Sequence, residues 1–167
     1  EFLESIQPFN WPLVIVSNQS GISRGLFTWD DYDLVTDRLL ELLGHNRSFF
    51  AIYANSEGPK SDPIHFRKPS PRMLTYAASK LNIDLSKSIM IGDRLTDLQA
   101  GTAAGVNSVL HVLTGMGQKE RISVNKSLDK DGFFTFHESS SNFVPLNTLN
   151  DFPFDLLNVI KTRNKHI

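Results

Sequence analysis

The sequence predicts an α/β fold of three layers, in which helices cover both faces of a parallel β-sheet. Short apolar runs, rich in β-branched residues, alternate along the chain with stretches in which apolar residues recur every three or four positions. The short runs hold few polar side chains, which is typical of strands that are buried on both faces. They lie at residues 13–16, 49–54, 88–91 and 109–113.

The intervening stretches carry the start and stop signals of helices. Thr28 begins one of them and Asp31 follows three residues later, as in a capping box. A second has Ser70 as its N-cap and Pro71 at its first position, where a missing N–H costs nothing. A third is expected from about residue 96 to the glycine at residue 105.

The last third of the chain has weaker patterns. Residues 118–131 are polar and charged, and we expect an exposed, mobile excursion there. Residues 133–136 predict a short edge strand, residues 143–144 another small piece of strand, and residues 154–162 a closing helix. No internal repeat or linker divides the sequence, so residues 1–167 are expected to form a single domain.

Composition and charge exclude several classes of function. A net charge of −1 gives no reason to expect nucleic acid or an anionic membrane as a partner. The absence of cysteine excludes disulfides, thiolate zinc sites and thiol nucleophiles within these residues. No apolar run approaches the roughly 18 residues of a membrane span, and no signal peptide is visible. We therefore expect a cytoplasmic protein; the oligomeric state stays open.

Polar side chains that suit phosphate chemistry lie at or just after the predicted strands. The carboxyl ends of parallel strands meet at one edge of the sheet, where ligands bind. A hydroxyl turn, two adjacent cations and two late carboxylates would be delivered to that edge. The candidate residues are Ser17, Asn18, Arg24, Arg67, Lys68, Asp93 and Asp97.

Residue chemistry suggests roles for the cations and the hydroxyl. Ser17, with backbone amides of its turn, can donate to phosphoryl oxygens. Lys68 supplies a compact positive charge that neutralises a phosphate or a carboxylate. Asn18 is a candidate substrate contact, and Arg24 and Arg67 can fork onto a second anionic group of a small phosphorylated metabolite.

The two carboxylates suggest a metal. Asp93 is a hard oxygen ligand that suits Mg²⁺, and Asp97 either holds a metal-bound water or orients Lys68. Taken singly, each of these residues has an ordinary structural role as a turn hydroxyl, a surface cation or a helix cap. Their order and placement together favour a common site.

Two histidines are given structural roles instead. His65 and Asp62 match no metal-ligand spacing, so His65 is expected to be a loop residue. His111 lies within a predicted strand and is expected to be packed or hydrogen-bonded.

Three stretches, in this order, resemble the haloacid dehalogenase superfamily. They are VIVSNQSGISRG at residues 14–25, FRKPSPRM at 66–73 and IMIGDRLTDLQAG at 89–101. The likeness covers roughly residues 1–115 and is closest to the D-glycero-D-manno-heptose bisphosphate phosphatases and the histidinol-phosphate phosphatases. It implies a Rossmann-like domain and Mg²⁺-dependent hydrolysis of phosphomonoesters through an aspartyl-phosphate. The implied substrate is a small phosphorylated sugar, first of all a bisphosphorylated one, or histidinol phosphate.

The resemblance also implies roles for single residues. Ser17 corresponds to the second motif of the superfamily, which binds the phosphoryl group. Lys68 corresponds to the cation of the third motif, with Arg67 beside it as a substrate contact. Asp93 corresponds to the metal ligand of the fourth motif, and Asp97 to its supporting acid.

This sequence departs from the family pattern in two places. The first motif, an Asp-x-Asp-Gly stretch that supplies the nucleophile and the general acid/base, would lie upstream of Leu13 and is not in this sequence. We expect a longer chain whose motif-bearing strand precedes residue 1, and phosphatase activity is conditional on that motif. The zinc loop of many heptose bisphosphate phosphatases would fall at residues 55–66, which contain no Cys, so zinc is not expected.

Three other functions were weighed. Without the nucleophile, the chain would be a non-catalytic phosphate-binding or scaffold module of the same fold. A signalling receiver domain also combines Asp, Ser or Thr, and Lys, but there the acids come first and Lys last, whereas here Ser17 precedes Lys68 and Asp93. A polynucleotide end-repair phosphatase would require a basic stripe, which the sequence lacks.

Overall fold

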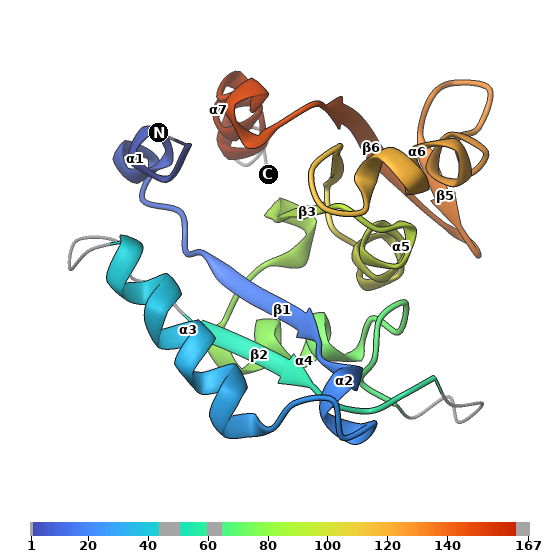
Figure 1. The fold of residues 1–167 in the computed structure, drawn as a ribbon. Helices are drawn as coiled ribbons and strands as arrows, with labels where there is room; N and C mark the ends of the chain where they lie inside the picture. Colours follow the sequence, from blue (N-terminus) through green and yellow to red (C-terminus); the bar gives the residue numbers. More distant parts are fainter. Residues whose placement is uncertain (1, 44–50, 60–64, 163–167) are drawn as a thin grey trace.

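The computed structural model describes residues 2–43, 51–59 and 65–162, and its strands form two sheets (Figure 1). The smaller sheet has the order β1-β2 and is parallel, with Val16 opposite Tyr53. The larger has the order β3-β4-β6-β5, in which β3, β4 and β6 are parallel and β5 is antiparallel. The strands are β1 (Val14–Asn18), β2 (Ala51–Asn55), β3 (Ile89–Gly92), β4 (Ser108–Val112), β5 (Phe134–Phe136) and β6 (Ser139–Leu146).

Helices connect the strands and cover them. Figure 1 shows α3 beside β1 and β2, α5 and α6 near β3 and β6, and α1 near α7. The helices are α1 (Phe2–Ile6), α2 (Ser20–Ser23), α3 (Trp29–Leu43), α4 (Arg72–Leu81), α5 (Leu95–Ala104), α6 (Gly117–Asn125) and α7 (Asp155–Thr162), with 3-10 turns η1 (Gln7–Phe9), η2 (Leu85–Lys87) and η3 (Leu149–Asp151).

Two hydrophobic cores lie on opposite faces of β3 and β4. Met90 and Val109 belong to one core, which also contains Met73 and Leu74 of α4. Leu110 belongs to the other, together with residues of α1 and α7. Because successive side chains of a strand point to opposite faces, neighbours such as Val109 and Leu110 enter different cores. The predicted three-layer α/β class is therefore confirmed.

The weaker predictions for the last third of the chain were partly wrong. Most of residues 118–131 are exposed as expected, but the helix in this stretch was not predicted: α6 begins at Gly117, and its Val124 is fully buried. The piece expected at 143–144 is part of the eight-residue β6, which lies between β4 and β5. The edge strand at β5 and the closing helix α7 were predicted correctly.

The helix signals were mostly correct. Thr28 and Asp31 form the expected capping box, since Asp31 Oδ2 accepts from Thr28 N at 2.8 Å. The helix after Ser70 begins at Arg72, one residue later than predicted, with Pro71 at the N-cap position. Residues 49–50 of the predicted second strand, and Asp62, lie outside the described residues. No described helix is both long and apolar enough to cross a membrane.

Candidate functional site

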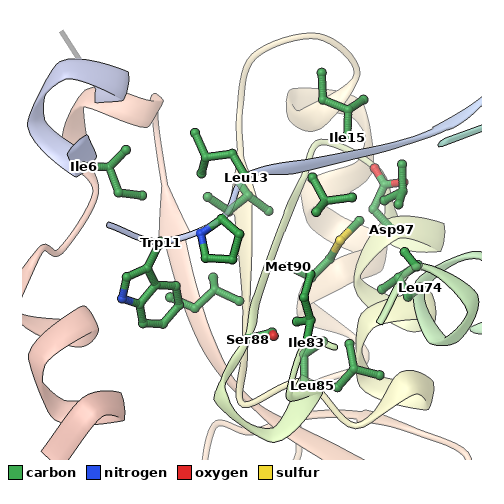
Figure 2. Close-up of a pocket in the computed structure, with 18 of the residues that line it drawn as sticks. Ile6, Trp11, Leu13, Ile15, Leu74, Ile83, Leu85, Ser88, Met90 and Asp97 are labelled. Atoms are coloured by element: carbon green, nitrogen blue, oxygen red, sulfur yellow. The ribbon is translucent and has the colours of Figure 1, made fainter. Parts of the chain in front are cut away.

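A cavity of about 1120 Å³ separates β1 from β3. Its walls include Leu13–Ser17 on one side and Ser88–Asp93 on the other. In Figure 2, Leu13, Ile15 and Met90 lie around it, and Asp97 stands toward one end. The walls are mostly apolar, and the polar groups of interest sit where β1 and β3 end. Of the predicted site residues, Ser17, Lys68, Asp93 and Asp97 all line this cavity.

A buried ion pair joins Asp97, in the stretch 89–101, to Lys68, in the stretch 66–73. Lys68 Nζ lies 2.7 Å from Asp97 Oδ1, and the two residues are 7% and 6% exposed. Lys68 Nζ also donates to the backbone oxygen of Val16 at 2.7 Å. The second oxygen of Asp97 accepts from Arg94 N at 3.2 Å, at the start of α5. Such a charge pair is stable only when both members stay together with their hydrogen bonds.

Asn18 fastens the Lys68 loop to the end of β1. Its side-chain amide makes two hydrogen bonds with the backbone of Lys68: Nδ2 donates to Lys68 O at 3.1 Å, and Oδ1 accepts from Lys68 N at 3.0 Å. Only Asn and Gln can donate and accept in this paired way through an uncharged side chain. The substrate contact predicted for Asn18 is untested, and the bonds present give it a positioning role.

Replacing Asn18 with Ala should lower the free energy of unfolding by about 1–3 kcal/mol, the usual cost of leaving buried backbone groups without partners. Urea denaturation monitored by circular dichroism measures this loss. Asn150→Ala, at an exposed asparagine, is the matched control and should change stability by less than about 0.5 kcal/mol. Equal stability of the two variants would show that the Asn18 bonds do not hold the loop.

Asp93 is held in the turn that follows β3. Its Oδ2 accepts from the backbone N–H of Met116 at 2.8 Å, and its backbone oxygen lies 3.2 Å from His111 Nε2. Among the described residues, no hydrogen bond to Oδ1 is found. Gly115 passes so close that an added Cβ would lie 2.3 Å from Asp93 Oδ2.

His111 is fully buried in β4, as a packed and hydrogen-bonded residue should be. Burial is the largest influence on its ring and holds the pKa of His111 below its ordinary value, and the charge of Arg121 acts in the same direction. Arg121 Nε donates to His111 Nδ1 at 2.8 Å. Sequence analysis did not single out Arg121, because α6 has few apolar positions to mark it as a helix.

The remaining candidates are less closely grouped. Ser17 Oγ lines the cavity and accepts from Gln19 Nε2 at 2.8 Å. Arg67 is half-buried and donates to Glu57 O at 3.3 Å. Arg24 is exposed and donates to Ser20 O at 3.2 Å. Neither arginine lines the cavity that Ser17, Lys68, Asp93 and Asp97 line.

The donor set fits Mg²⁺ in part. Mg²⁺ prefers one or two carboxylates and fills its shell with water and phosphate oxygens, which a single carboxylate at Asp93 satisfies. Asp97 is engaged by Lys68 and is a poorer candidate. No group of three or more His, Asp or Glu side chains that could hold a metal occurs among the described residues.

Comparisons with known proteins show which family the chain resembles. A family model for HAD-like hydrolases matches residues 65–130. The D-glycero-beta-D-manno-heptose-1,7-bisphosphate 7-phosphatase of Mesorhizobium japonicum is 43% identical over 102 residues, which cover 57% of this chain and 47% of that protein. The chain spans about half to two thirds of the length of the first curated relatives that it matches.

Two solved structures are similar over nearly the whole chain. The D,D-heptose 1,7-bisphosphate phosphatase from B. bronchiseptica, complexed with magnesium and phosphate, has a TM-score of 0.68 at 25% identity and covers 99% of this chain and 81% of that one. A candidate HAD-like phosphatase from Mesorhizobium loti has a TM-score of 0.64 at 31% identity and covers 96% of this chain and 70% of that one.

Proposed function

Because the chain belongs to the haloacid dehalogenase-like hydrolase family, we propose that it carries most of the active site of a phosphomonoester phosphatase. The observation that supports this most directly is that Ser17, Lys68, Asp93 and Asp97 all line a single cavity. These residues come from three separate stretches of the chain, and a purely structural role would not require them to share a cavity.

A sugar bisphosphate, in the first instance a heptose bisphosphate, is the proposed substrate. The curated relatives and one structural neighbour are named for heptose bisphosphate. They lend no support to histidinol phosphate, the other substrate class that the resemblance implied. Arg24 and Arg67 remain the proposed contacts of a second anionic group, which would have to approach from outside the cavity.

Each side chain has a proposed task. Ser17 Oγ, with N–H groups of the turn after β1, donates to oxygens of the phosphoryl group. Lys68 holds positive charge beside it, and Asp97 fixes the position of the Lys68 ammonium. Asp93 presents its carboxylate to Mg²⁺, which when bound neutralises charge that develops on the transferring group. Asn18 binds the backbone of Lys68 and so fixes the position of this cation relative to the end of β1.

The attacking carboxylate is proposed to lie on a strand that precedes Glu1 in the complete protein and fills the cavity. Among the described strands, β1 is paired only with β2, and β3 only with β4. The other edge of β1 and the other edge of β3 face the cavity. Buried strand edges leave backbone N–H and C=O groups without partners, and a parallel strand between them would satisfy both. Its carboxyl end would then lie beside Lys68 and Asp93.

In the family reaction, that carboxylate attacks phosphorus and the phosphoester bond breaks. The second Asp of the upstream motif gives its proton to the leaving alcohol. It then takes a proton from the water that splits the aspartyl-phosphate and releases inorganic phosphate. Two easier steps thus replace one difficult displacement. This chain supplies the groups that hold the phosphoryl oxygens, and the upstream segment supplies the nucleophile.

The test uses the complete protein with a panel of phosphorylated metabolites, heptose 1,7-bisphosphate among them, with and without Mg²⁺. Phosphate release should require Mg²⁺, and Asp93→Asn should abolish it, because the amide no longer offers an anionic ligand. Gel filtration and circular dichroism check that the variant is folded. Retention of most of the wild-type turnover in Asp93→Asn would remove Asp93 from the metal site.

Reading the coding sequence upstream of Glu1 separates the two leading functions. An Asp-x-Asp pair at the end of an apolar run supports the phosphatase. A complete protein that lacks the pair, and that binds inorganic phosphate without hydrolysing any substrate of the panel, would instead be a phosphate-binding module of the same fold.

A further inference from the structure

We propose that Arg121 is a positioning residue, which acts through His111 to hold the turn that carries Asp93. The inference rests on the proposed function in one respect, namely that Asp93 is the metal ligand. Its evidence is a separate set of contacts made by α6, a helix to which neither the resemblance nor the proposed reaction assigns any task.

The contacts of the His111 ring decide which of its two nitrogens carries the proton. A guanidinium can only donate, so the 2.8 Å contact from Arg121 Nε requires His111 Nδ1 to be an acceptor without a proton. The proton of the neutral ring is therefore on Nε2, which donates to the backbone oxygen of Asp93 at 3.2 Å. The ring is fully buried, so no water competes for either nitrogen. Arg121 thus selects the tautomer whose Nε2–H can donate to the backbone oxygen of Asp93.

Arg121 is itself fixed by the ends of two strands. Its Nη2 donates to the backbone oxygen of His111 at 3.0 Å and to that of Leu146 at 2.9 Å. These carbonyls lie near the carboxyl ends of β4 and β6, which are paired in parallel. One guanidinium therefore joins α6, β4, β6 and the His111 ring, a geometry that the fork of Arg provides and the single ammonium of Lys does not.

The same segment touches the Asp93 turn at two more points. Met116 N, at the start of α6, donates to Asp93 Oδ2 at 2.8 Å. Glu120 Oε2 accepts from Leu95 N at 3.4 Å. The carbonyl of Asp93, its carboxylate and the N–H of Leu95 are thus all bonded to α6 or to the ring that α6 orients. A shift of α6 would turn the Asp93 carboxylate away from the cavity.

The experiment compares Arg121→Met with Lys119→Met in the complete protein. Lys119 is an exposed cation on the same helix, so the control removes the same charge without touching the network. Binding of Mn²⁺, followed by water-proton relaxation as a substitute for Mg²⁺, should weaken at least about tenfold in Arg121→Met, as for other supports of a metal ligand. It should be unchanged in Lys119→Met. With Mg²⁺ in excess, turnover should recover more than it does in Asp93→Asn.

Nitrogen-15 NMR of the histidine side chains gives a readout that needs no metal. In the wild type, His111 should carry its proton on Nε2, with Nδ1 accepting a hydrogen bond. In Arg121→Met that signature should be lost, and the Met116 amide should exchange with solvent faster. Arg121→Lys, which keeps the charge but loses the fork, should lie between the two and serves if Arg121→Met does not fold.

The outcomes are distinct. A wild-type His111 with its proton on Nδ1 would overturn the inference, as would Arg121→Met with wild-type metal affinity and wild-type exchange at Met116. If the wild type binds no Mn²⁺ and hydrolyses nothing, the proposed function fails, and the NMR comparison still decides whether Arg121 holds the turn.

Discussion

Asp97→Asn should lower the free energy of unfolding by about 3–5 kcal/mol and abolish phosphate release, because it leaves the Lys68 ammonium buried without its counter-charge. The two side chains are 8% and 9% exposed, so water cannot replace the lost partner. Urea denaturation measures the loss of stability, and release of phosphate from the active substrate of the panel measures the loss of activity.

Two further variants test whether the lost stability comes from a buried charge without a partner or from the loss of an ion pair as such. Glu41→Gln breaks the exposed pair between Arg38 and Glu41, both 66% exposed, and should cost less than about 0.5 kcal/mol. The double replacement Lys68→Met with Asp97→Leu should regain part of the stability lost by Asp97→Asn, since no buried charge is left alone. It should stay inactive. A double variant no more stable than Asp97→Asn would show that the cost does not come from an unpaired ammonium.

Gly115→Ala should reduce phosphate release about 100-fold, a loss that a misplacement of about 1 Å in an active site can cause. The added Cβ would lie 2.3 Å from Asp93 Oδ2, so the carboxylate has to move. The backbone at Gly115 also has a φ of 61°, where a side chain costs about 1–2 kcal/mol. Steady-state kinetics of the complete protein and urea denaturation measure the two effects.

Gly132→Ala is the matched control for this variant. Gly132 has a φ of 84°, and an added Cβ there meets nothing within 4 Å. Gly132→Ala should lose about as much stability through backbone strain as Gly115→Ala does, and it should keep wild-type turnover. If Gly115→Ala and Gly132→Ala kept the same turnover, the close approach of Gly115 would have no role in placing Asp93.

Much of the fold could be predicted because its signals are local. Each of these signals spans only a few residues, so periodicity and cap chemistry decide the outcome. Examples are the apolar runs of β1, β3 and β4 and the capping box at Thr28. The predictions failed where such signals are weak. β6 begins with three serines, and α6 has few apolar positions, so their place in the structure depends on packing.

The sequence by itself determined the order of the main strands and helices as far as β4, the residue types at the strand ends and the family resemblance that they carry. Only the tertiary structure decided that Lys68 is paired with Asp97, that Asn18 binds the Lys68 backbone 50 residues away, and that Arg121 reaches Leu146. The reason is physical: these contacts join distant parts of the chain, and their partners are fixed by packing between sheets and helices, which leaves no local periodic mark.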